Sequence, residues 1–61
     1  MRIQTFLGKV SVEALSQMDE HINQWLRDNH VDPKFVHQMF GYEQYHEGNR
    51  VEPVVVTSVW F

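Results

Sequence analysis

The C-terminal segment VEPVVVTSVWF places the strongest constraint on how this chain can fold. Between Val54 and Phe61 only Thr57 and Ser58 are not apolar, so a strand built from these residues is apolar on both faces. Sixty-one residues make one domain, which we expect to span 1–61, with room for about one covering helix. The helix can shelter one face of the strand, and the sequence raises the question of what shelters the other.

Residues from Ser11 to about Asp28 have the pattern of an amphipathic helix. Apolar residues form one stripe along it and polar residues occupy the opposite side. Ser11 is suited to cap the N-terminus, and Asn29 to end the helix in the left-handed conformation before Pro33. The stripe consists of Val12, Leu15, Met18, Ile22, Trp25 and Leu26.

Two further segments have the composition of strands. Residues 1–7, MRIQTFL, contain several strand formers and end where Gly8 and Lys9 break the run. Residues 34–45, KFVHQMFGYEQY, are strand-like without clean alternation, and Gly41 predicts a bulge that switches faces.

The segment HEGNR predicts a hairpin between the second and third strands. A two-residue turn at Gly48-Asn49 places Glu47 opposite Arg50. In that register Tyr42 faces Val55, Met39 faces Ser58 and His37 faces Trp60. Pro53 cannot donate to a ladder, so we expect pairing to begin at Val54.

The element order is therefore strand, helix, strand, strand, and the fold class is α+β. We expect one helix packed on a three-stranded, mainly antiparallel sheet, with the most apolar strand, the third, in the centre. If the helix covers Val55, Val59 and Phe61, the opposite face is left without cover.

A patch of roughly 500 Å² on that face would cost about 12 kcal/mol in water, at roughly 25 cal/mol per Å². We expect a second copy of the chain to cover it in a homodimer, which edge pairing through the first or second strand could extend. A histidine there would make assembly sensitive to pH. The predicted interface residues are Val54, Val56, Trp60, Met39 and His37.

A second hypothesis is an oligomer that binds a small molecule. A flat aromatic ligand such as a flavin would lie between Trp60, Tyr42 and Phe40 of adjacent subunits. We nevertheless predict no bound cofactor for the preferred assembly role.

Other chemistry finds no support in the residue pattern. Cysteine is absent, the four histidines have no metal-ligand spacing, and no motif positions a base beside a nucleophile. We therefore expect no catalytic, cofactor or metal site, and no enzyme. Five basic residues are scattered and outnumbered by eight acids, which disfavours nucleic acid. No apolar run is long enough to cross a membrane, and we expect a cytoplasmic protein.

The element order resembles that of dodecins, short bacterial and archaeal proteins that form hollow dodecamers and bind flavins between aromatic side chains. The dodecin tryptophan that stacks on flavin lies in the second strand, where this chain has Phe40 and Tyr42, so no binding residue is carried over. The pattern N-Q-W-L at residues 23–26, followed by a strand and an apolar C-terminal strand, resembles short bacterial sporulation-associated and uncharacterised proteins.

Overall fold

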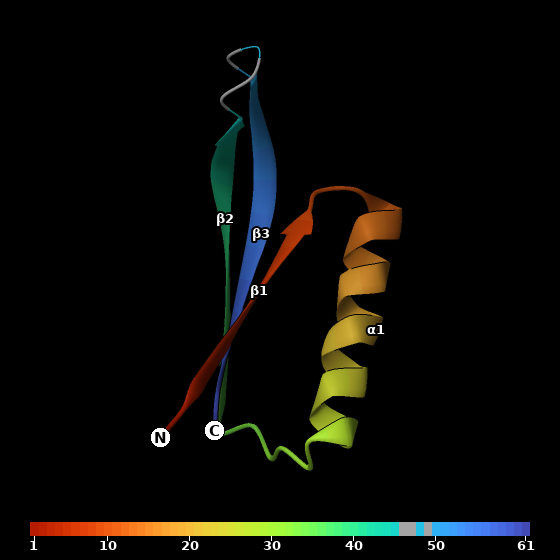
Figure 1. The fold of residues 1–61 in the computed structure, drawn as a ribbon, viewed down its shortest axis with the longest axis vertical. Helices are drawn as coiled ribbons and strands as arrows, with labels where there is room; N and C mark the ends of the chain where they lie inside the picture. Colours follow the sequence, from red (N-terminus) through yellow and green to blue (C-terminus); the bar gives the residue numbers. More distant parts are fainter. Residues whose placement is uncertain (46–47, 49) are drawn as a thin grey trace.

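The computed structural model describes residues 1–45, 48 and 50–61. The helix lies against one side of a three-stranded sheet with strand order β1-β3-β2, and both strand pairs are antiparallel (Figure 1). The predicted α+β fold and the central position of the third strand are confirmed. The elements in chain order are β1 (Ile3–Lys9), α1 (Val12–Asp28), β2 (Phe35–Tyr45) and β3 (Arg50–Trp60).

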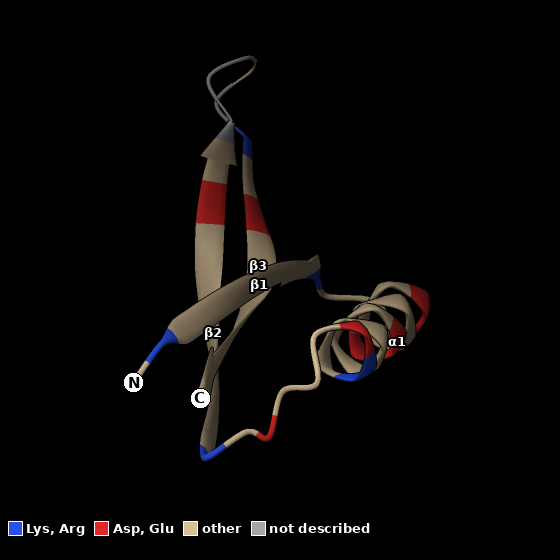
Figure 2. Ribbon diagram, turned by 60° about the horizontal axis from the view of Figure 1, so that its bottom comes forward, with Lys and Arg blue, Asp and Glu red and all other residues tan. Residues whose placement is uncertain are grey.

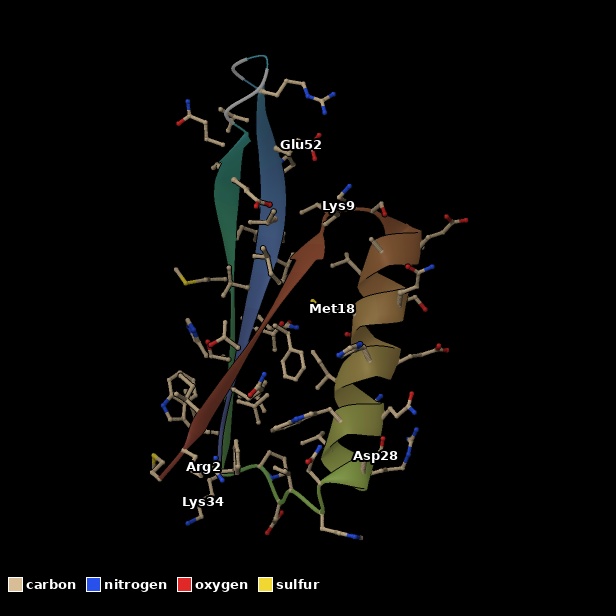
Figure 3. The ribbon with its side chains drawn as sticks, in the orientation of Figure 1. Arg2, Lys9, Met18, Asp28, Lys34 and Glu52 are labelled. Atoms are coloured by element: carbon tan, nitrogen blue, oxygen red, sulfur yellow. The ribbon has the colours of Figure 1, made fainter. Side chains whose placement is uncertain are left out.

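Strand β1 continues through the two residues that were expected to break it. Gly8 pairs with Val55 and Lys9 pairs with Val54. The glycine serves close packing, because a Cβ atom at position 8 would lie 2.6 Å from Sδ of Met18 in α1. The absence of that Cβ lets the helix approach the end of β1 (Figure 3).

The predicted hairpin register is wrong by two residues. His37 lies opposite Ser58, Met39 opposite Val56, and the last pair is Tyr45 with Arg50. The last described pair leaves residues 46–49 between the two strands, and the turn predicted at Gly48-Asn49 falls in this segment, of which the structure describes Gly48 alone. The proposed partner of Arg50, Glu47, lies outside the described residues, and Arg50 instead pairs with Glu52, with 3.7 Å between Nη2 and Oε1.

The bulge predicted at Gly41 is also absent, since pairing runs without interruption from Phe35 to Tyr45. The strand therefore keeps its alternation, and each side chain stays on the face that its number dictates. A Cβ atom at Gly41 would lie 3.9 Å from Cγ2 of Val54 across the strand pair, an ordinary contact distance, so packing does not require a glycine at this position.

Strand β3 begins four residues before the predicted start and includes Pro53. Arg2 and Phe61 exchange two backbone hydrogen bonds, of 2.6 and 2.8 Å, so odd-numbered residues of β3 direct their backbone groups toward β1. β1 ends at Lys9, opposite Val54. A residue at position 53 would direct its N–H toward β1, but β1 has already ended there. Proline, which has no N–H, therefore costs no ladder hydrogen bond at this position.

The helix ends are set by local hydrogen bonds. The Ser11 hydroxyl oxygen accepts from the Ala14 N–H at 3.0 Å, which confirms the predicted N-cap. At the other end the Asn29 side chain donates to the Trp25 carbonyl oxygen at 2.9 Å. The left-handed residue is His30, with φ 52°, and not Asn29 as predicted.

The core lies between α1, β1 and β3. Met18 is the buried residue of the helix, and its sulfur accepts from the hydroxyl of buried Thr57 at 3.9 Å. Phe6 packs edge-on against Trp25, which in turn packs edge-on against Phe61. The first residue of the predicted stripe, Val12, does not join this core and is 88% exposed.

Replacing Gly8 by alanine should lower the free energy of unfolding, because the new methyl group meets Met18. We expect a loss of about 1–3 kcal/mol, the usual cost of overpacking, relative to the matched control Gly41→Ala. Urea unfolding of both variants at one protein concentration measures the difference. Equal stabilities would contradict the close approach of α1 to β1.

Candidate interaction surface

The face of the sheet turned away from α1, called here the open face, is organised in three rows across the strands. The strand register places Leu7, Val56 and Met39 in one row, and Ile3, Trp60 and Phe35 in another. Between these apolar rows lies a polar row that holds Thr5, Ser58 and His37. The open face therefore has an apolar–polar–apolar pattern centred on Ser58.

Both apolar rows remain in contact with solvent in the single chain. Ile3, Leu7, Phe35 and Met39 are each more than half exposed, while Val56 and Trp60 on the central strand are half-buried. Large apolar surfaces of this kind are uncommon on isolated proteins and usually mark contact sites. The open face is thus an apolar surface of the sheet that α1 leaves uncovered.

Aromatic rings gather at one end of the open face. The Phe35 and His37 rings are parallel within 9°, with centroids 6.4 Å apart, and Phe35 also contacts Trp60 at 5.3 Å. These contacts fix the orientation of three side chains that belong to two neighbouring strands. The imidazole is consequently part of a ring cluster and lies beside the apolar row.

Charges on the open face are confined to its hairpin end. Figure 2 shows one acidic band on each of β2 and β3 near the hairpin, which belong to Glu43 and Glu52. Lys9 lies at the end of β1 nearest to them. The three rows themselves contain no charged residue apart from His37 when it is protonated.

The structure brings the five predicted interface residues onto one face. His37, Met39, Val56 and Trp60 belong to the three rows, and Val54 lies in the next row, between Lys9 and Gly41. Val54 is only 5% exposed, because its own chain already encloses it. It therefore supports the sheet and offers little surface of its own to a partner.

The three residues of the ligand hypothesis are not brought together within one chain. Trp60 is on the open face, whereas Phe40 and Tyr42 are on the side of α1. Phe40 and Tyr42 are 75% and 78% exposed, so the helix does not cover them either. A ligand in contact with all three would need groups from different subunits.

The sequence reasoning missed a groove on the helix side of the sheet. α1 packs along β1, and two hollows of about 370 and 310 Å³, both bordered by Asp19 and Gln38, lie between it and β2. Their walls include Leu15, Ile22 and Leu26 of the helix, and Val36 and Phe40 of β2.

The groove follows from the width of one helix. An α-helix is about 10 Å across and spans about two strands that are ~4.8 Å apart, so the third strand stays bare. The missing alternation of β2, which is apolar on both faces, was the sequence signal for this arrangement.

The described residues form neither a metal site nor a membrane-spanning helix. Within residues 1–45, 48 and 50–61, no group of three or more histidine, cysteine or acidic side chains could hold a metal ion. In the same part of the chain, no helix has the length and apolarity needed to cross a membrane.

No protein-family model, no curated protein and no solved structure matches this chain significantly. The resemblance to short sporulation-associated proteins and the dodecin-like element order therefore stay predictions. Function is therefore inferred from the shape and chemistry of the protein surface.

Two valines of β3 provide a direct test that the two faces differ. Val59 is 1% exposed beneath α1, whereas Val56 on the open face is half-buried. We expect Val59→Ala to cost about 2 kcal/mol in unfolding free energy and Val56→Ala less than about 1 kcal/mol, measured at concentrations where the chain is monomeric. Equal costs would mean that a single chain shelters both faces.

Proposed function

We propose that this protein is a small non-enzymatic module that works by assembling with copies of itself through the open face. The observation that carries the proposal is the apolar–polar–apolar order of its rows. Two sheets of this kind can pack face to face and bury both apolar rows of each.

The row pattern favours a second copy over an unrelated partner, because it matches itself under two-fold rotation. An axis in the sheet plane through the row of Ser58 brings the polar row of one chain over the polar row of the other. The hydroxyl groups of Thr5 and Ser58 and the His37 imidazole can then hydrogen-bond across the interface. Self-complementary surfaces of this type are characteristic of two-fold dimers.

The favourable free energy of this assembly comes from apolar surface that the isolated chain leaves in contact with water. Each apolar side chain buried there contributes roughly 25 cal/mol per Å² of surface removed from water. A domain of about 60 residues buries only roughly 60% of the surface that its unfolded chain exposes, so its stability as a single chain is marginal. Assembly through the open face would therefore stabilise the fold as well as join the copies.

Binding of a flat aromatic ligand between subunits is a second candidate function. The ring cluster of Phe35, His37 and Trp60 favours it, because aromatic faces at a subunit interface can stack on a planar molecule. Native mass spectrometry of protein purified from its own host would detect such a ligand as an added mass. Loss of that mass in Trp60→Ala with unchanged assembly would support this candidate.

The assembly proposal is tested by placing a charge in the open face. Met39→Glu replaces a 55% exposed side chain, so the fold should tolerate it, but the charge would be buried without a partner in the assembly. We expect the dissociation constant to rise by about a hundredfold or more. Sedimentation equilibrium at micromolar concentrations measures this change against the 7.3 kDa monomer.

The matched control is Val12→Glu, which makes a similar change at a helix position that is 88% exposed and distant from the open face. This variant should assemble as the wild-type protein does. A wild-type chain that sediments as a monomer, or a Met39→Glu variant that assembles like the control, would overturn the proposal.

A further inference from the structure

The outer edge of β2 is a second surface with the properties of a binding site. β2 lies at one side of the sheet, and its eleven residues, Phe35–Tyr45, pair with β3 along their whole length. Natural sheets protect such edges with lysine, proline or a bulge. The sequence FVHQMFGYEQY has no proline, lysine or arginine, and its pairing is free of bulges.

The hydrogen-bonding pattern shows which residues face outward. The odd-numbered residues of β3 direct their backbone N–H and C=O groups toward β1, so its even-numbered residues direct theirs toward β2. In β2 these groups bond to the odd-numbered residues, which the register places opposite the even-numbered residues of β3. The even-numbered residues of β2 consequently direct their N–H and C=O groups to the outer edge. These residues are Val36, Gln38, Phe40, Tyr42 and Gln44.

The other edge of the sheet is less suited to pairing. β1 has seven residues, Ile3–Lys9, and ends in a lysine. α1 packs along it, and Ala14, Gln17 and His21 of the helix border the same hollow as β1. A strand that approached β1 would therefore meet the helix on one side. The outer edge of β2 is free of this obstacle, because the groove separates β2 from α1.

We propose that the outer edge of β2 pairs with β2 of a second copy, antiparallel and centred on Phe40. Only registers that place even-numbered residues opposite even-numbered residues use the outward groups of both strands. The register centred on Phe40 is the one that pairs all five of them, with Gln38 opposite Tyr42 and Val36 opposite Gln44 of the second copy.

The side chains suit this register on both faces. On the helix side, the exposed Phe40 rings of the two copies become neighbours, and aromatic pairs of this kind stabilise antiparallel strands. On the open face, Met39 lies opposite the Cβ-free Gly41, and Glu43 lies opposite His37. The one acidic residue of the strand thus faces an imidazole whose N–H can donate a hydrogen bond to it, and no like charges are opposed.

Edge pairing is compatible with assembly through the open face. The two-fold axis that joins two β2 strands runs perpendicular to the sheet, whereas the axis for face-to-face packing lies in its plane. The first axis passes beside Phe40, whereas the second follows the row that holds Ser58 and His37, three residues away along β2, so the two axes do not intersect. Edge pairing then forms six-stranded sheets, and packing through the open faces links these sheets into assemblies larger than a dimer.

A single introduced cysteine tests the register, because the chain has none of its own. In Phe40→Cys the two Cα atoms would be about 5.5 Å apart, within disulfide range. Mild oxidation should give a covalent dimer for Phe40→Cys and none for the control Val36→Cys, whose counterpart in the second copy is Gln44. Equal cross-linking of the two variants, or none in either, would overturn this register.

A proline at position 38 tests the edge itself. Gln38→Pro removes an outward N–H and no backbone bond to β3, so the fold should persist. It also removes the side-chain bond from Gln38 Nε2 to Thr57 Oγ1 of β3, 3.1 Å long, and Gln38→Ala controls for this loss because it removes the same side chain and keeps the N–H. Native mass spectrometry should show species larger than a dimer for wild type and Gln38→Ala, and a dimer for Gln38→Pro. Phe40→Lys, which opposes two positive charges across the axis, should also give a dimer, and circular dichroism checks that each variant is folded.

The same measurement separates this inference from the proposed function. Wild-type dimers that Gln38→Pro and Phe40→Lys leave intact but Met39→Glu disrupts would overturn edge pairing and leave open-face assembly standing. Dimers that respond in the opposite way would overturn the open face and support the edge. A wild-type monomer would overturn both.

Discussion

The packing of one helix along one side of a three-stranded sheet is the constraint on which the rest of this structure depends. Met18 inserts between α1 and the sheet beside Gly8 and reaches Thr57, so the helix is held close to β1 and β3. That position buries Val55 and Val59 and leaves β2 bare on the same side. Among the described residues, no helix covers the opposite face, where Ile3, Leu7, Phe35 and Met39 are each more than half exposed.

Two surfaces of different chemistry result from this packing. The open face offers apolar side chains, whose burial is favourable but sets little direction. The edge of β2 offers backbone groups, whose hydrogen bonds fix orientation and register. In an assembly that uses both surfaces, the first would provide most of the free energy and the second would define which residues meet. Neither role needs a catalytic group or a bound ion.

The elements and their order could be predicted from local patterns. The helix stripe of Leu15, Met18 and Ile22, the Ser11 cap and the apolar third strand each depend on neighbours in sequence, and the structure confirms them. The faces of β3 were also predictable, because a strand alternates strictly and a register error of two residues leaves every side chain on its face. The predicted interface residues therefore share a face although their predicted partners were wrong.

What the sequence could not give depends on contacts between distant segments. From the sequence alone Gly8 is expected to end a strand, and only the position of Met18 shows that it serves close packing. Pro53 is likewise expected to prevent pairing, and only the end of β1 at Lys9 shows that no hydrogen bond is lost there. The same holds for the groove, which exists because α1 lies over β1 and not over β2. The composition predicts that one helix leaves part of the apolar surface uncovered. Only the packing of α1 on the sheet shows where that surface lies.

The central claim is that another copy of the chain covers the open face. Isotope-filtered nuclear Overhauser spectroscopy on a mixture of labelled and unlabelled protein measures contacts between copies directly. The account predicts intermolecular signals from the methyl groups of Met39 and Val56, and none from Val59 beneath α1. Intermolecular signals from Val59, or none from the open face, would contradict it.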